Sequence, residues 1–145
     1  IAVLPTDDPN ADFNTSDNST EWISKVSGSY NFPHGIMTSA ILESRSGEPW
    51  ARTVLFSGGG TIPTQVLNVE PYGSRLYPTA THLDVRLEKQ FKLLSSHELA
   101  VRVNAYNMLN ANTVLAANAR SGATFGRPTS IMPARLFEFS ASYKF

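Results

Sequence analysis

Apolar and polar side chains alternate along the stretch His82-Leu-Asp-Val-Arg-Leu-Glu-Lys-Gln-Phe-Lys-Leu93. One set is Leu83, Val85, Leu87, Lys89, Phe91 and Leu93, and the other is His82, Asp84, Arg86, Glu88, Gln90 and Lys92. Successive side chains of a β-strand point to opposite faces, whereas helical side chains repeat about every 3.6 residues. The pattern therefore predicts a strand with one apolar and one polar face.

The same alternation continues in residues 98–108 and 135–145, which predicts two more strands. Their apolar sets are Leu99, Val101, Val103 and Ala105, followed by Phe137, Phe139, Ala141, Tyr143 and Phe145. Two weaker strands are expected before them, joined by Pro33-His34-Gly35. A three-residue hairpin loop that ends in Gly favours a left-handed Gly and a bulge, which pairs Phe32 with Ile36 and Val26 with Leu42. For the later hairpin we expect Leu93 opposite Leu99, Glu88 opposite Asn104 and Gln90 opposite Arg102.

Composition excludes several function classes. Twelve basic and twelve acidic residues give a net charge of zero, which argues against a nucleic-acid partner. The absence of Cys excludes disulfides and thiol chemistry. No apolar run is long enough for a transmembrane helix, and the first ten residues do not resemble a signal peptide. We therefore expect either that a leader was removed or that the chain belongs to a longer protein.

Candidate catalytic and metal-binding motifs are weak, so we expect neither an enzyme nor a cofactor. Four acidic residues near the start could bind Ca²⁺, but a solvated loop is the favoured interpretation: Asp7, Asp8, Asp12 and Asp17. Gly58-Gly59-Gly60 lacks the Lys of a phosphate loop, and no Gly-x-Ser-x-Gly motif occurs. His34, His82 and His97 have no metal-ligand spacing.

The connections between the expected strands are short at one end of the sheet and long at the other, which is typical of outer-membrane barrels. Residues 47–78 and 110–133 are rich in Gly and Pro and form the long connections, with short strand pieces at 52–56 and 65–69. The expected strands are about as long as the 9–11 residues of a tilted membrane crossing. Aromatic side chains near strand ends match the girdles at the two membrane interfaces. The girdle candidates are Trp22, Tyr30 and Phe32.

In this arrangement one face of the sheet contacts lipid and the other faces a wet lumen. The expected lipid-facing residues are Leu83, Val85, Leu87, Leu99, Val101, Val103, Phe137 and Phe139. The expected lumen-facing residues are Asp84, Arg86, Glu88, Arg102, Glu138 and Lys144, either as a substrate path or plug contact or, as we favour, as cross-strand ion pairs that fix the register. Lys89 is the exception on the apolar face. A Lys costs about 2–4 kcal/mol at mid-membrane and about 0–1 near the interface, so we expect it to snorkel toward the turn end.

Four phrases of the C-terminal half resemble the end of TonB-dependent outer-membrane receptors, especially the Oar-like members with a carboxypeptidase-regulatory-like domain. They are His82-Leu-Asp-Val-Arg-Leu-Glu-Lys-Gln-Phe91, Val101-Arg-Val-Asn-Ala-Tyr-Asn-Met-Leu-Asn-Ala-Asn-Thr113, Phe125-Gly-Arg-Pro-Thr-Ser-Ile131 and Pro133-Ala-Arg-Leu-Phe-Glu-Phe-Ser-Ala-Ser-Tyr-Lys-Phe145. The resemblance implies a 22-stranded barrel with a plug. It also implies uptake of a siderophore, glycan, peptide or similar scarce nutrient with energy from TonB. Tyr143 and Phe145 resemble the signal read by the barrel-assembly machinery. We expect these 145 residues to include neither the plug nor the TonB box, and about five strands cannot close a barrel.

We therefore expect an all-β chain of antiparallel up-and-down strands, the C-terminal part of such a barrel in the outer membrane of a Gram-negative bacterium. Its expected partners are outer-membrane lipid, the rest of the barrel and plug, TonB and the barrel-assembly machinery. The expected segments are extracellular loops at 1–20, 47–78 and 110–133, hairpins at 21–46 and 79–109, and the last strand at 134–145. On its own the chain should form an open sheet rather than a closed five-stranded barrel. Two alternatives remain open: an outer-membrane adhesion module of Oar type, and a soluble β-sandwich binding domain.

Overall fold

The computed structural model describes residues 21–57, 60, 64–94 and 97–145. Within them the regular structure is a set of antiparallel strands and one short 3₁₀ turn, η1 (Pro33–Gly35), with no α-helix, so the predicted all-β antiparallel class is confirmed. Residues 1–20, with the four acidic Ca²⁺ candidates, and the Gly58–Gly59 pair lie outside the described residues. The described chain divides into two compact units, which we call the sheet unit and the loop unit.

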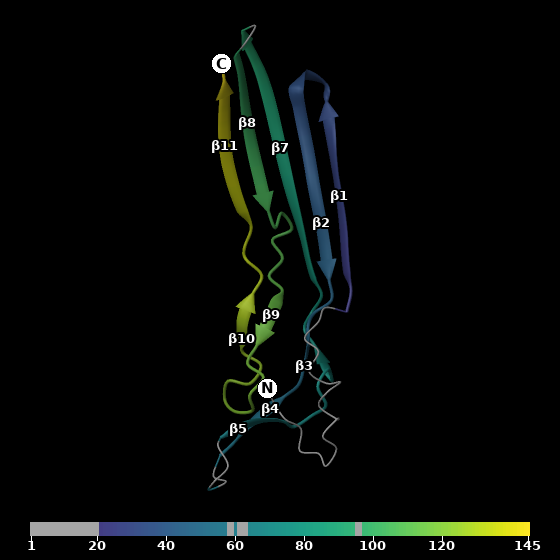
Figure 1. The fold of residues 1–145 in the computed structure, drawn as a ribbon, viewed down its shortest axis with the longest axis vertical. Coiled ribbons are helices and arrows are strands. Elements are labelled where there is room, and N and C mark those ends of the chain that lie inside the picture. The colour runs from purple at the N-terminus through teal and green to yellow at the C-terminus, as the bar shows by residue number, and fades with distance from the viewer. Residues whose placement is uncertain (1–20, 58–59, 61–63, 95–96) are drawn as a thin grey trace. The chain divides into compact units, whose positions relative to one another are not determined.

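The sheet unit contains five long strands and comprises Ile23–Arg45, Ala80–Asn112 and Met132–Phe145. Its strands are β1 (Ile23–Phe32), β2 (Ile36–Arg45), β7 (Ala80–Leu94), β8 (His97–Tyr106) and β11 (Leu136–Lys144). Figure 1 shows them side by side in the order β1-β2-β7-β8-β11. Strands β1 and β11 are the two edges, and they do not pair with each other in the described part of the chain. The five strands therefore form an open sheet, as expected.

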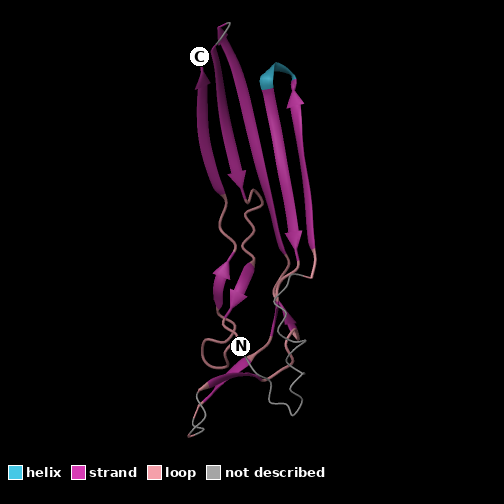
Figure 2. Ribbon diagram, viewed as in Figure 1, coloured by secondary structure: helices cyan, strands magenta, loops and turns pink. Residues whose placement is uncertain are grey.

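The β1–β2 hairpin has the predicted register, with Phe32 opposite Ile36 and Val26 opposite Leu42. Its turn, drawn in cyan in Figure 2, places His34 and Gly35 at positive φ, 67° and 72°. A Cβ added to Gly35 would lie 2.9 Å from the backbone oxygen of Gln90. Glycine is therefore required here both by the left-handed backbone and by the close approach of β7.

The β7–β8 register differs from the prediction by two residues. Phe91 pairs with Leu99, whereas the predicted partner of Leu99 was Leu93. Pairing of the two strands continues up to Leu94 and His97, with a register shift between Lys92 and Leu94. The connection between β7 and β8 is therefore shorter than expected. A shift of two residues keeps every side chain on its face. It does change the polar partners, because Glu88 now lies opposite Arg102.

Continuous register across the five strands gives the sheet two chemically different faces. Apolar residues of β7 pair with apolar residues of β8, as in Leu87 opposite Val103, and Val103 in turn pairs with Phe139 of β11. The apolar face also includes Val26 of β1 and Leu42 of β2, because Leu42 pairs with Leu83. The structure thus brings all the residues predicted to face lipid onto one side of the sheet.

The end of β8 is shaped by Asn107, which is 6% exposed and has φ 49°. Its side-chain amide donates to the backbone oxygens of Ala111 and Pro133, at 2.9 and 2.7 Å, and its oxygen accepts from Ala111 N at 2.9 Å. Its backbone N–H donates to the carboxylate of Asp84, 2.9 Å away. Asn110 also has positive φ, 52°. Asn tolerates this conformation better than most residues, so Asn107 and Asn110 shape the exit of β8.

The loop unit is built from short strand pairs and comprises Ser46–Thr79 and Thr113–Ile131 together with the described residues Glu21 and Trp22. Its strands are β3 (Pro49–Trp50), β4 (Thr53–Phe56), β5 (Gln65–Asn68), β6 (Arg75–Leu76), β9 (Val114–Ala117) and β10 (Pro128–Ile131). They pair as β3 with β6, β4 with β5, and β9 with β10. Strands β4 and β5 match the strand pieces expected within the first long connection.

Candidate functional site

The apolar face of the sheet unit is a candidate interaction surface. Its side chains remain exposed: Leu87 by 49%, Phe137 by 46% and Phe139 by 75%. Among the described residues, the buried hydrophobic ones are Ala51, Ala80 and Ala105, and no large side chain is fully buried. A soluble sheet of this length covers its apolar face with a second layer. In the described part of the chain, the predicted lipid-facing side chains are not packed into such a core.

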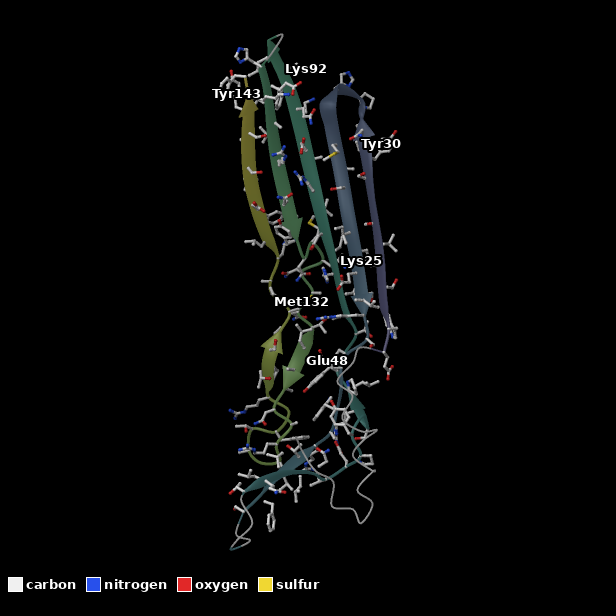
Figure 3. The ribbon with its side chains drawn as sticks, in the orientation of Figure 1. Lys25, Tyr30, Glu48, Lys92, Met132 and Tyr143 are labelled. Atoms are coloured by element: carbon white, nitrogen blue, oxygen red, sulfur yellow. The ribbon has the colours of Figure 1, made fainter. Side chains whose placement is uncertain are left out.

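Aromatic side chains gather where the short turns lie. Figure 3 places Tyr30 and Tyr143 toward the same end of the sheet. Tyr30 packs edge-on against Phe32, with ring centroids 4.7 Å apart. The Tyr143 ring stacks on the His97 ring, and the Tyr143 Oη lies 2.6 Å from the His97 Nδ1. The ring of Phe145, which is 89% exposed, lies beside the Tyr143 ring. The girdle candidates Tyr30 and Phe32 thus lie toward the same end of the sheet as Tyr143.

Trp22, the third girdle candidate, lies outside the sheet. Strand β1 begins at Ile23, directly after Trp22. The backbone oxygen of Trp22 instead accepts from Ser46 N at 3.0 Å, and the Ser46 hydroxyl accepts from Glu21 N at 2.9 Å. Trp22 and Ser46 both belong to the loop unit.

The polar face is organised around Glu88, which is 4% exposed. Its Oε2 accepts from Arg102 Nε at 2.6 Å and lies 3.4 Å from Arg86 Nη2. Its Oε1 accepts from Gln90 Nε2 at 2.8 Å. The Nε of Arg86 is buried and has no hydrogen-bond partner among the described residues. The ion pair between Arg102 of β8 and the buried carboxylate of Glu88 on β7 joins the two strands, and Arg86 adds a second guanidinium from β7 itself.

The other predicted lumen residues form separate contacts rather than one site. Glu138 accepts from Tyr106 Oη at 2.9 Å and from Asn104 Nδ2 at 3.2 Å. Asp84 caps the backbone at Asn107, and Lys144 lies opposite Glu98. A groove of about 230 Å³ passes over this face, lined in part by Asp84, Arg86, Asn104 and Tyr106. The polar groups that line it are suited to hydrogen-bonding a polar surface or solute.

The loop unit contains an aromatic cluster that the sequence did not single out as a group. Trp50 stacks on Tyr77 at 5.4 Å and lies 6.1 Å from Phe125. The Arg52 guanidinium lies 4.9 Å from the Phe125 ring, and that of Arg75 lies 5.3 Å from the Trp50 ring. Tyr77 Oη also bonds both the N–H and the oxygen of Ala117. Tyr77 and Phe125 thus take part in the packing of the loops. Tyr72 likewise donates to Pro49 O at 2.8 Å.

Glu70 links two parts of this cluster. Its carboxylate forms an ion pair with Arg75 and accepts from the backbone N–H of Arg52 at 2.7 Å. The hydrogen bond from Arg75 is the main reason why the pKa of Glu70 is lowered from its ordinary value of 4.5, and the Arg52 amide lowers it further. The carboxylate form is therefore favoured by the folded loop unit.

The described residues contain no cluster of three or more His, Cys, Asp or Glu side chains that could hold a metal ion. Among them, no helix has the length and apolar character needed to cross a bilayer. Comparisons with protein-family models, curated proteins and solved structures find no match to this chain.

Proposed function

We propose that this chain is part of the wall of an outer-membrane β-barrel of the TonB-dependent receptor type, which takes up a scarce nutrient. The observation that carries the proposal is the exposed apolar face that runs across five long antiparallel strands. In water such a face is a strong aggregation hazard, whereas in a bilayer it replaces lipid–lipid contacts. The two open edges, β1 and β11, are the places where neighbouring barrel strands would pair.

The distribution of side chains supports the same environment. Strands of 10, 10, 15, 10 and 9 residues suit tilted membrane crossings. Aromatic residues at the turn end match an interfacial girdle. The polar face, with its buried Glu88 and paired guanidiniums, suits a wet lumen. The identification as a TonB-dependent receptor rests on the resemblance of the C-terminal phrases.

The membrane placement is tested by two adjacent positions of β11. Phe139 and Ser140 lie on opposite faces, and the chain has no native Cys, so single cysteines can carry a spin label at either position. In the full protein inserted in liposomes, we expect Phe139→Cys to be accessible to oxygen in the bilayer and Ser140→Cys to a water-soluble nickel chelate. Equal access of the nickel chelate to both labels would contradict the proposal.

The transport role is tested genetically. We expect deletion of the gene and deletion of TonB in the same host to cause the same growth defect when one nutrient is limiting. Removing residues 47–78 should then reduce that uptake. If the deletion abolishes cell contact and leaves uptake intact, the protein is an adhesion module. If the full protein purifies without detergent as a stable monomer, it is a soluble binding domain.

A further inference from the structure

Lys89 is the one Lys, Arg, Asp or Glu on the apolar face of the five strands of the sheet unit. It lies near the turn end, because its partner on β2 is Ile36, the first residue after η1. Its Nζ donates to the backbone oxygen of His34 in that turn, and it lies 5.5 Å from the Phe91 ring. The side chain therefore points toward the turn, as the snorkelling prediction required.

On the polar face, several cations lie opposite carboxylates on neighbouring strands. Lys25 lies opposite Glu43, with 2.7 Å between Nζ and Oε2. Arg102 pairs with Glu88. Lys92 and Lys144 both lie opposite Glu98.

Lys89 has no such match. Its cross-strand partners are Ile36 and Val101, and no ion pair joins it to any described residue. An ammonium group has three N–H donors, of which the His34 carbonyl accepts one. The sheet thus leaves a cation at the edge of an apolar surface with donors to spare.

We infer that Lys89 binds the phosphate of a membrane phospholipid whose acyl chains lie on the apolar face. The inference rests on the proposed function, because it requires that face to contact a bilayer. A phosphate supplies the missing negative charge and strong acceptor oxygens. Phe91 and the Tyr30–Phe32 pair provide the aromatic surroundings usual at headgroup level. The turn end thereby gains a headgroup site that selects phosphate-bearing lipids.

The test uses the full protein in dodecyl maltoside and native mass spectrometry. Three probes are titrated: dimyristoyl phosphatidylglycerol, a digalactosyl diacylglycerol without phosphate, and inorganic phosphate. We expect Lys89→Gln to weaken phosphatidylglycerol binding about tenfold, equivalent to about 1.4 kcal/mol, and Lys89→Arg to retain it. Lys92→Gln is the matched control, because Lys92 lies on the polar face near the same end and should bind as the parent protein does (Figure 3).

A second measurement needs no variant. In the parent protein, phosphatidylglycerol should protect Lys89 from an acetylating reagent relative to Lys92, and the galactolipid should not. The inference is overturned if Lys89→Gln binds phosphatidylglycerol as tightly as the parent, if the galactolipid protects equally, or if millimolar inorganic phosphate displaces the lipid, which would indicate a free-anion site. Failure of the parent protein to insert into any bilayer would instead overturn the proposed function.

Discussion

In the sheet unit, strands of 9 to 15 residues satisfy backbone hydrogen bonds by long ladders and leave large apolar side chains exposed. In the loop unit, strands of two to four residues pair briefly, and aromatic packing and side-chain bonds to the backbone hold the segments together. The sheet unit thus has a regular backbone with exposed side chains, whereas the loop unit has an irregular backbone whose aromatic side chains pack against one another. Under the proposed function, lipid would cover the exposed side chains of the sheet unit, whereas the aromatic side chains of the loop unit contact one another.

The largest effect should come from placing a charge on the open face. Val85→Arg puts a guanidinium midway along β7 on the apolar side, which costs about 2–4 kcal/mol in a bilayer. Ser140→Arg on the polar side of β11 is the control and should be tolerated. The measurement is the free energy of unfolding in liposomes, with the amount of folded protein in the outer membrane as a second readout. Equal losses at both positions would refute the assignment of faces.

Next in size is the loss of the strand exit of the sheet unit. Asn107→Ala removes the acceptor and donors that serve Ala111 and Pro133, and it places Ala at positive φ. Unsatisfied buried polar groups cost about 1–3 kcal/mol each, so we expect a loss of about 2 kcal/mol by denaturant unfolding. Asn112→Ala, at an exposed position nearby, should change stability little. A loss at Asn112 as large as that at Asn107 would contradict this role.

A smaller and local effect is expected in the loop unit. Trp50→Ala removes the stacking on Tyr77, worth about 0.5–1.5 kcal/mol, and the contact with Arg75, worth about 0.5–1 kcal/mol. Proteolysis within residues 46–79 should accelerate while the unfolding midpoint of the full protein in a membrane stays unchanged. Phe56→Ala, at a residue that is 42% exposed in the same unit, is the control. If Trp50→Ala lowers the stability of the sheet equally, the two units do not act separately.

The smallest effect concerns acidity. The pKa of Glu70 in the folded protein lies below its ordinary value of 4.5. The contribution of the Glu70 carboxylate to the stability of the loop unit is therefore present above the unfolded pKa and is lost as pH falls through the folded pKa. Local proteolysis of the loop unit should therefore rise below about pH 4.5, and Glu70→Gln should remove that step. A pH profile unchanged by Glu70→Gln would show that other groups cause the acid sensitivity.

Alternation in the sequence was enough to predict the five long strands and their two faces, because period-two burial is a local property of each strand. It also predicted the β1–β2 register, since the three-residue turn ending in Gly35 leaves little choice. It did not predict the β7–β8 register. Both alignments place apolar residues opposite one another. The pairing of Glu88 with Arg102 distinguishes the observed one, and that choice depends on turn length.

The candidate sites were less predictable than the strands. The contacts of Glu138 with Tyr106 and Asn104 require the β8–β11 register, which joins segments separated by a long connection. The Trp50 cluster brings together three segments of irregular chain. The signal in the sequence that could have predicted the cluster was the presence of Trp, Tyr, Phe and Arg among Gly and Pro residues. Lipid contact, lumen contact and the assembly role of Tyr143 and Phe145 stay predictions.

The two bare edges of the sheet unit bear on how its stability should be measured. Along β1 and β11, backbone donors and acceptors on one side have no strand partner in the described part of the chain. In hydrocarbon, each such group costs several kcal/mol. Under the proposed function, this chain would have no folding equilibrium of its own in a membrane, and cooperative unfolding would be a property of the closed barrel. A thermal midpoint recorded for the isolated segment would report self-association along those edges rather than its native energetics.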